Sequence, residues 1–356
     1  MLTDASLCRP LEDISDDEVM AVARTLSKRT KHSHGTAADS TIFEKLGLPI
    51  QKALTKSYTF FSPLPEASTD EYVLGVDEAG RGPVLGPMVY ATCFCKESYY
   101  AQLSTLGFAD SKQLNEDQRD RLFAVIQQND VRESSGWSIR CISPQDISQC
   151  MLRRSKYNLN SLAHDATIQL IRDALGRGIN LKRVFIDTVG PPASYQKKLE
   201  GLFPGIQITV AKKADSLYPI VSAASICAKV TRDAHLSRWV FAESKLQNSM
   251  SSVYGSGYPG DPNTIRWLKE SLDQVFGYPG IIRFSWSTCA RILLEQAVVV
   301  VWADDEDAPN NASLVKYFSQ AKASSAAAAA AGSDNLARPR SKFFGHRRPI
   351  NISVSL

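Results

Sequence analysis

The sequence contains no apolar run long enough to span a membrane, and acidic residues dominate its N-terminal segment. A membrane-spanning helix needs about 20 predominantly apolar residues. Signal and transit peptides are basic, whereas this N-terminal segment carries acidic residues such as Asp4, Glu12 and Asp13. A strong charge imbalance is also absent, because 41 basic and 37 acidic residues give a net charge of +4. This mild excess permits a polyanionic partner without requiring one. We therefore expect a soluble, intracellular protein with no membrane partner.

The seven cysteines show no clustering of the kind that binds zinc. Cys93 and Cys95 are separated by one residue, a spacing that is typical of alternating strand positions rather than of a zinc knuckle. Free thiols in a chain of 356 residues indicate a reducing compartment. The 44% hydrophobic and 22% charged residues are ordinary for a globular protein, and the length suits one large domain with appendages.

What the sequence does contain is an apolar segment that ends in two adjacent carboxylates and a Gly-Arg-Gly turn. Residues Val73–Val76 predict a short buried strand with Asp77 and Glu78 at its carboxyl end, where open α/β sheets place their sites. Successive strand side chains point to opposite faces. The two carboxylates can therefore share one site only if the strand breaks at Glu78, which Gly80 favours. The alternative interpretation is a solvated strand end followed by a turn.

The same design recurs twice further along the chain. The apolar strand Arg183–Ile186 is followed by Asp187, and the strand Ile206–Val210 is followed closely by Asp215. Other segments predict two further strands and several helices, namely Met88–Phe94, Trp137–Ile142, a helix from Glu116, Asn158–Arg177, Pro219–Lys229, Thr264–Leu272 and Thr288–Trp302. Strands that alternate with helices predict a mixed α/β sheet with flanking helices.

Composition divides the chain into four predicted segments. They are a mostly loose N-terminal extension at residues 1–70 that includes a helix at Asp16–Lys28, a central domain at 71–262, a helical extension at 263–302, and a low-complexity, disordered tail at 303–356. The helical extension is more apolar than an exposed appendage requires, so we expect partner chains to cover part of it.

Four carboxylates stand at predicted strand ends: Asp77, Glu78, Asp187 and Asp215. If they converge, their mutual repulsion requires a neutralising cation. Hard oxygen ligands without neighbouring His or Cys favour Mg²⁺ or Mn²⁺ over zinc, and two such ions about 4 Å apart can clamp both oxygens of a phosphoryl displacement. Nearby cations suit phosphate contacts, although a solvated surface charge is the simpler explanation of each lysine alone: Lys112, Lys212, Lys213, Lys229 and Arg232.

Five ordered motifs resemble those of the type 2 ribonucleases H, in particular the catalytic (A) subunit of the eukaryotic enzymes. They are Gly75–Pro83, Asp110–Lys112, Ile186–Gly190, Lys213–Asp215 and Ser222–Asp233, and the segments Tyr157–Leu162 and Tyr254–Pro259 strengthen the eukaryotic assignment. The resemblance covers residues 72–302, and none of the four carboxylates is substituted.

The resemblance implies a ribonuclease H-like fold in residues 71–262, with a helical C-terminal extension. It implies Mg²⁺- or Mn²⁺-dependent cleavage of the RNA strand of RNA–DNA hybrids, and incision 5′ to single ribonucleotides in duplex DNA, which leaves 5′-phosphomonoesters. It further implies a heterotrimer with two non-catalytic subunits, held through the C-terminal part of this chain. The implied setting is the nucleus, with roles in primer removal during DNA replication, ribonucleotide excision repair and mismatch repair.

The same resemblance implies roles for individual residues. The catalytic, metal-binding set is Asp77, Glu78, Asp187 and Asp215. The ribose is sensed by Gly80, Arg81, Gly82 and Tyr258, and further substrate contacts come from Lys112, Lys229 and Arg232. We expect the backbone of Arg81 to read the ribose and its side chain to be free to meet a phosphate.

Two competing interpretations are a different nuclease or transferase of the same fold, and a non-catalytic nucleic-acid-binding protein. The Gly-Arg-Gly turn and Tyr258 argue against the first, because enzymes that cleave only DNA have no ribose hydroxyl to recognise; intact carboxylates argue against the second.

In the tail, Asn311–Phe318 is a degenerate form of the sliding-clamp-binding pattern, with Asn in place of the usual Gln. It predicts at most a weak sliding-clamp contact, and a short apolar helix remnant is the simpler interpretation.

Overall fold

The computed structural model describes residues 43, 47–64, 69–108, 114–155, 157–188, 190–243, 245–247 and 249–298. The chain divides into two units, Met1–Val298 and Val299–Leu356, and every described residue belongs to the first. Several expectations lie outside the described residues: the helix at Asp16–Lys28, the motif Asp110–Lys112, and the tail with its clamp-like pattern. The helix expected at Thr288–Trp302 ends earlier than predicted, at Gln296, because Ala297 is extended.

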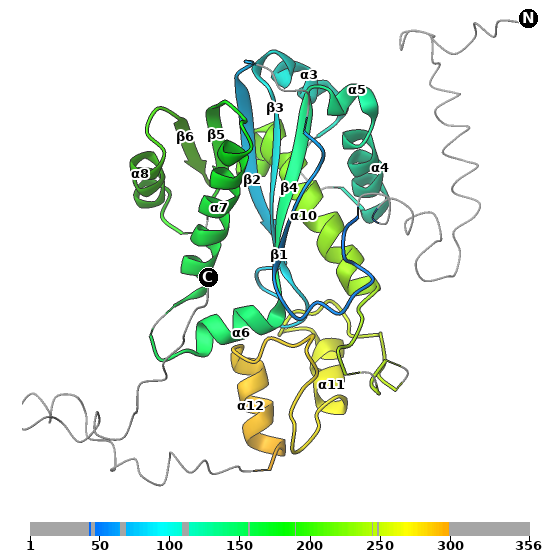
Figure 1. Cartoon of the computed structure of the whole chain (residues 1–356). Coiled ribbons are helices and arrows are strands. Elements are labelled where there is room, and N and C mark those ends of the chain that lie inside the picture. The colour runs from blue at the N-terminus through cyan, green and yellow to red at the C-terminus, as the bar shows by residue number, and fades with distance from the viewer. Residues whose placement is uncertain are drawn as a thin grey trace, which may run out of the picture. The chain divides into compact units, whose positions relative to one another are not determined.

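The first unit is built on a six-stranded sheet with strand order β1-β4-β3-β2-β5-β6 (Figure 1). The strands are β1 (Tyr58–Phe61), β2 (Tyr72–Ala79), β3 (Met88–Lys96), β4 (Ser135–Ile142), β5 (Leu181–Asp187) and β6 (Gln207–Ala211). The pairs β1–β4, β4–β3 and β3–β2 are antiparallel, whereas β2–β5 and β5–β6 are parallel. The predicted mixed sheet is confirmed. Because β2, β5 and β6 run in the same direction, their carboxyl ends meet at one edge.

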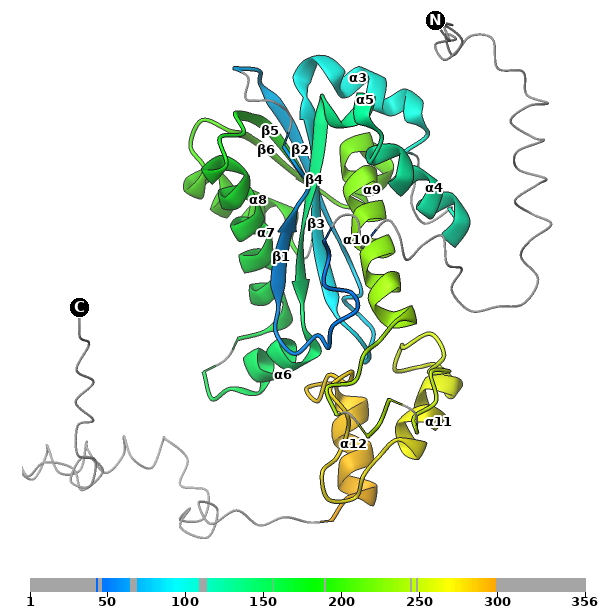
Figure 2. The same cartoon turned by 45° about the vertical axis from the view of Figure 1, so that its right-hand side comes forward.

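Helices cover both faces of the sheet (Figures 1 and 2). Their bounds are α3 (Tyr100–Leu103), α4 (Glu116–Ile126), α5 (Asn129–Arg132), α6 (Pro144–Leu152), α7 (Leu159–Gly176), α8 (Pro192–Leu202), α9 (Ala214–Leu217), α10 (Pro219–Ser237), α11 (Pro262–Glu270) and α12 (Ser287–Gln296), with short 3-10 turns at Glu97–Tyr99 and Ser104–Leu106. Local sequence explains several helix starts. Asn115 and Gln118 form a capping box at α4, Asn158 caps α7, and Pro219 occupies the first turn of α10.

Alternation along β2 assigns its side chains to the two faces. Val73 and Ala79 belong to the hydrophobic cluster that contains α4 and α10 residues, whereas Leu74 and Val76 belong to the cluster formed with α7 and α8. Asp77 therefore leaves the strand on the α10 side and Glu78 on the α7 and α8 side.

The expectation of a loose extension at residues 1–70 is wrong for residues 47–64. β1 pairs with β4 along its whole length, and the Tyr58 hydroxyl lies 2.7 Å from His235 Nε2 on α10. Leu48, Ile50 and Leu54 are buried in the main hydrophobic cluster. The prolines of this segment predicted a loop. Its apolar side chains nevertheless stabilise a docked segment, because they become buried beside β4 and the C-terminal end of α10.

The predicted C-terminal helices are present as α11 and α12, and they pack against the rest of the unit. Trp267 and Ile292 are buried in the main cluster, and Leu85 forms a β-bridge with Ile282. Within the described part of the chain, no helix combines the length and apolar character needed to cross a bilayer.

Candidate active site

Three of the four predicted carboxylates converge at the carboxyl ends of β2 and β5. Ligand oxygens of Asp77, Glu78 and Asp187 all lie within 4.8 Å of one another. Asp215 follows β6 in the first turn of α9 and is close enough for its charge to raise the pKa of Asp77. The acidic residues at the carboxyl ends of three neighbouring strands thus gather at one edge of the sheet.

The convergence of Asp77 and Glu78 does not arise from a break in the strand, so that expectation is wrong. β2 continues to Ala79 and stays paired with β3 to its end. The parallel ladder between β2 and β5, however, ends at Val76 and Ile186. Because β5 itself ends at Asp187, side chains from both faces of β2 can reach round the end of β5 and meet there.

Backbone groups hold both aspartates in place. The Glu78 amide donates to Asp77 Oδ1 at 2.8 Å, and the Ala214 amide donates to Asp187 Oδ1 at 2.9 Å. The second contact depends on Lys213, whose φ of 56° is the only positive value at a non-glycine position in the described chain. Non-glycine residues adopt this conformation at an energetic cost and are enriched in functional sites. At Lys213 it turns the chain so that Ala214 faces Asp187 and Asp215 enters the cluster.

The electrostatics of the cluster favour a cation. Burial raises the pKa of Asp77 to about 7, and the charges of Asp187 and Asp215 add to this effect, whereas hydrogen bonds from the Ser225 hydroxyl and the Glu78 amide act in the opposite direction. Asp77 and Asp215 are only 6% and 3% exposed. Crowded, buried carboxylates of this kind fit a hard divalent cation with oxygen ligands. The residues therefore fit Mg²⁺ or Mn²⁺.

The Gly-Arg-Gly turn lies directly after the carboxylates and is held by a buried arginine. Gly80 has a φ of +77°, which a residue with a Cβ adopts only with strain. The Arg283 guanidinium donates to the carbonyls of Gly80, Arg81 and Gly86 at 2.6, 3.1 and 2.8 Å. Trp286 Nε1 donates to the Gly82 carbonyl at 3.0 Å. The turn is a rigid part of the site because all three of its carbonyls accept hydrogen bonds from the C-terminal region.

Tyr258 lies beside this turn. A Cβ built on Gly82 would be 3.0 Å from Tyr258 Cε1, so a larger residue there would require the ring to shift by a few tenths of an ångström. Tyr258 is 52% exposed, and its loop is anchored by the Gly257 amide, which donates to Thr264 Oγ1 at 2.9 Å. An exposed aromatic ring therefore stands next to glycine backbone at the edge of the carboxylate cluster.

The predicted cations take different positions. The Arg81 side chain is not free for a phosphate, because it donates to Asn160 Oδ1 on α7. Arg232 lies beneath the turn, where its Nε would be 2.6 Å from a Cβ on Gly80, and it forms an ion pair with Asp233 at 3.1 Å. Lys229 is half-buried on α10, Lys212 and Lys213 are exposed, and Lys112 lies outside the described residues.

Three residues of the site were missed from the sequence: Ser225, Arg283 and Trp286. Ser225 lies within the motif Ser222–Asp233, but nothing in the sequence assigns its hydroxyl a role in the site. Arg283 and Trp286 follow the motifs by more than twenty residues, and no local pattern connects them to the turn. Their signal is the clustering of aromatic and charged residues between α11 and α12.

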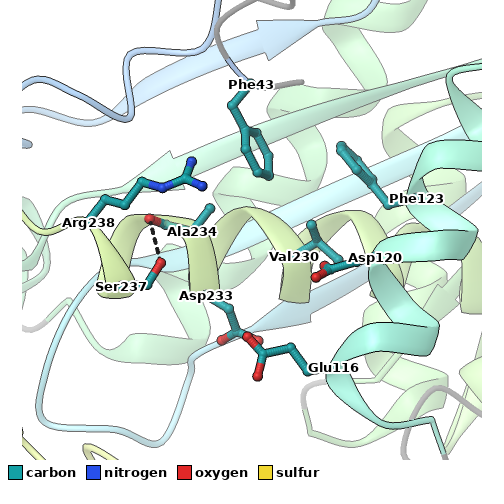
Figure 3. A pocket seen from close by; sticks show the side chains of 9 residues that line it. All are labelled: Phe43, Glu116, Asp120, Phe123, Val230, Asp233, Ala234, Ser237 and Arg238. Atoms are coloured by element: carbon teal, nitrogen blue, oxygen red, sulfur yellow. Dashed lines mark hydrogen bonds between the residues drawn. The ribbon is translucent and has the colours of Figure 1, made fainter. Parts of the chain in front are cut away.

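A cavity between α4 and α10 is separate from the site (Figure 3). Its volume is about 60 Å³, and Phe43 and Phe123 line one side while Glu116, Asp120 and Asp233 line another. None of the four predicted carboxylates lines it. Its acidic lining would repel phosphates, and its volume is too small for a nucleotide.

Comparison with known proteins agrees with this geometry. The family model described as Ribonuclease HII matches residues 74–289. The A subunit of ribonuclease H2 from Homo sapiens is 52% identical over 260 residues, covering 72% of this chain and 85% of that protein. The corresponding Caenorhabditis elegans protein is 46% identical over 281 residues, covering 79% and 92%. The crystal structure of ribonuclease H2 from Pyrococcus horikoshii OT3 superimposes with a TM-score of 0.52 at 32% identity, covering 63% of this chain and 98% of that one. The ribonuclease H-like α/β fold expected from the motifs is confirmed.

Proposed function

Because this chain belongs to the ribonuclease HII family and is a ribonuclease H hydrolase, we propose that it is the catalytic subunit of a type 2 enzyme. It cleaves the RNA strand of RNA–DNA hybrids and incises 5′ to single ribonucleotides embedded in duplex DNA, leaving 5′-phosphomonoesters. The observation that carries this proposal is the approach of Asp77, Glu78 and Asp187 within 4.8 Å of one another, beside a glycine turn held from the C-terminal region.

The catalytic set consists of Asp77, Glu78, Asp187 and Asp215, which would hold two Mg²⁺ or Mn²⁺ ions. When bound, such ions supply Lewis acidity and an activated water for phosphodiester hydrolysis. The protein's own task is positioning. The Glu78 amide holds Asp77 and the Ala214 amide holds Asp187, so the carboxylates keep their arrangement before substrate arrives.

Ribose recognition falls to the Gly-Arg-Gly turn and Tyr258. The 2′-hydroxyl is what allows a protein to distinguish RNA from DNA at a given position. Gly80 and Gly82 lack a Cβ, so their backbone can approach the sugar, and the Tyr258 ring can pack on the neighbouring deoxyribose. Arg81 contributes through its backbone, since its side chain bonds to Asn160. Lys112, Lys229 and Arg232 are assigned to the substrate backbone, although Arg232 lies beneath Gly80 and pairs with Asp233 in this structure.

Partner subunits cover part of residues 263–302. Several apolar residues of this extension, such as Trp267 and Ile292, are buried within the chain, so they leave no surface for partners. Four others remain exposed: Val275 at 63%, Phe276 at 87%, Leu294 at 86% and Val298 at 55%. The relatives carry the name of one lettered subunit of ribonuclease H2, which implies further subunits in their assemblies. We assign this exposed set to the two non-catalytic subunits of a heterotrimer.

The cellular setting is proposed from the resemblance: the nucleus, with roles in ribonucleotide excision repair, primer removal during replication and mismatch repair. The tail at 303–356 and its clamp-like pattern remain predictions from the sequence, with at most a weak sliding-clamp contact.

The experiment compares three duplexes of one sequence: an RNA–DNA hybrid, DNA with one ribonucleotide, and DNA alone. The full chain is assayed alone and together with its two co-expressed partners, with Mg²⁺, with Mn²⁺ and with chelator. We expect metal-dependent cleavage of the first two duplexes only, greater activity with partners, and a loss of at least a hundredfold in Asp77→Asn. Near-normal cleavage by Asp77→Asn would refute the metal-site assignment, and full activity of the isolated chain with no response to partners would refute the heterotrimer.

A further inference from the structure

The backbone of α10 lies closer to β2 than it could if position 75 carried a side chain. A Cβ built on Gly75 would be 2.6 Å from the backbone nitrogen of Val221 and would also overlap the Ile220 carbonyl. The two backbones therefore meet in direct contact, and the helix lies alongside the strand in both views of the fold (Figures 1 and 2). This contact fixes the position of α10 along β2, and therefore which α10 residues lie beside the carboxylates.

The contact brings Ser225 level with Asp77. Five helical residues separate Ile220 from Ser225, a rise of about 7.5 Å, and two strand residues separate Gly75 from Asp77, a rise of about 6.6 Å. Gly75 and Asp77 share one face of β2 because strand side chains alternate. The serine on the helix and the aspartate on the strand therefore face each other.

The Ser225 hydroxyl hydrogen-bonds to the Asp77 carboxylate. Ser225 is 1% exposed and Asp77 is 6% exposed, so water has little access to this contact. The carboxylate thus has two protein donors, the α10 hydroxyl and the Glu78 amide. Two donors that arrive from different elements limit how the carboxylate can rotate.

We propose that Ser225 is a positioning residue, whose hydroxyl holds the Asp77 carboxylate in the orientation that receives a divalent cation. This inference rests on the proposed function of Asp77 as a metal ligand. Hydrogen bonds from outside the ligand set orient carboxylate ligands, and their loss typically weakens metal affinity or activity by about 10- to 100-fold. Packing alone does not require a hydroxyl at this position, because the neighbouring buried residues Ala224 and Ala228 pack on the same helix without one.

The experiment measures Mn²⁺ binding to the full chain by calorimetric titration, without substrate. We expect Ser225→Ala to bind Mn²⁺ roughly tenfold more weakly, with a melting temperature in chelator within a few degrees of wild type because the change removes a single atom. Thr231→Val is the matched control. Thr231 is another fully buried hydroxyl on α10, and its oxygen has no hydrogen-bond partner in the described part of the chain. This variant should bind Mn²⁺ as wild type does.

The outcomes separate this inference from the proposed function. If Asp77→Asn loses Mn²⁺ affinity but Ser225→Ala binds within twofold of wild type, the role of Ser225 is refuted and the metal site stands. A lower melting temperature of Ser225→Ala with unchanged Mn²⁺ affinity would also refute it, because that result describes a purely structural serine. If Asp77→Asn binds Mn²⁺ as tightly as wild type, the proposed metal site itself is wrong.

Discussion

The buried guanidinium of Arg283 donates to the carbonyl of Gly80, 203 residues earlier in the chain, at 2.6 Å. The same side chain reaches the carbonyls of Arg81 and Gly86. A planar guanidinium can serve several acceptors at once, whereas a lysine ammonium is a single point charge on a flexible stem. The region between α11 and α12 therefore controls the shape of the turn that follows the carboxylates.

We predict that Arg283→Lys disorders the turn even though the positive charge is kept. Unsatisfied buried carbonyls cost about 1–3 kcal/mol each, so the free energy of unfolding in urea should fall by at least this amount. Incision at a single ribonucleotide should fall further than the loss of folded protein accounts for. The control is Arg266→Lys, an exposed arginine on α11 that bonds only to Asn263 in the described structure. Wild-type stability and incision in Arg283→Lys would contradict the role of the Arg283 guanidinium in holding the turn.

We predict that Tyr258→Ala impairs incision at an isolated ribonucleotide far more than cleavage of a continuous hybrid. The ring lies against Gly82 and is half-exposed, so it is available to pack on the sugar that follows the ribonucleotide. Tyr258→Phe keeps the ring and should retain most of the preference, which separates the ring from the hydroxyl. Steady-state rates on both substrates over a range of Mg²⁺ concentrations provide the measurement. Equal losses on the two substrates would instead make Tyr258 a structural residue of its loop.

We predict that the metal-free protein loses stability as pH rises from about 4 to about 7. Burial, with the neighbouring acids, raises the pKa of Asp77 from 3.8 to about 7. Below pH 4 this carboxyl is protonated in the folded and unfolded states, so it contributes no difference. Between the two values only the unfolded state is ionised, so unfolding becomes progressively more favourable, and the full penalty remains above pH 7.

The measurement is the melting temperature in chelator across this pH range. Asp77→Asn cannot ionise, so its curve should fall less steeply than that of the wild type and lie above it at pH 8. Saturating Mg²⁺ should raise the wild-type curve most above pH 7, because a metal ligand must be deprotonated. Parallel curves for the two proteins in chelator would show that Asp77 does not carry this pH dependence.

We predict opposite effects for alanine at two glycines. Gly75→Ala would force a methyl group against the α10 backbone, which cannot move aside as a flexible side chain can, so the free energy of unfolding should fall by about 1–3 kcal/mol or more. Gly201→Ala lies on α8 with no atom within 4 Å of the added methyl, and it should raise stability by up to about 1 kcal/mol. Urea denaturation of the two variants provides the comparison. A neutral Gly75→Ala would contradict the close contact that places Ser225 opposite Asp77.

The sequence by itself determined the features that depend on neighbouring residues. An apolar run followed by a carboxylate predicts a strand end. This was confirmed at Asp187, the last residue of β5, whereas β2 runs two residues past Asp77 to Ala79. Helix α7 was predicted to within one residue at each end because Asn158 caps it and an apolar stripe follows. These signals are local, since a few adjacent side chains and the backbone geometry decide them.

Only the tertiary structure decided the rest. Whether Asp77 and Glu78 meet depends on where β5 ends, and not on a break in their own strand. The strand Tyr58–Phe61 belongs to the sheet because β4, far along the chain, offers it an edge. The bonds of Arg81 to Asn160 and of Arg283 to Gly80 join segments that lie 79 and 203 residues apart. Such contacts leave no periodic pattern in the sequence, because their free energy comes from packing that exists only once the sheet and its helices have assembled.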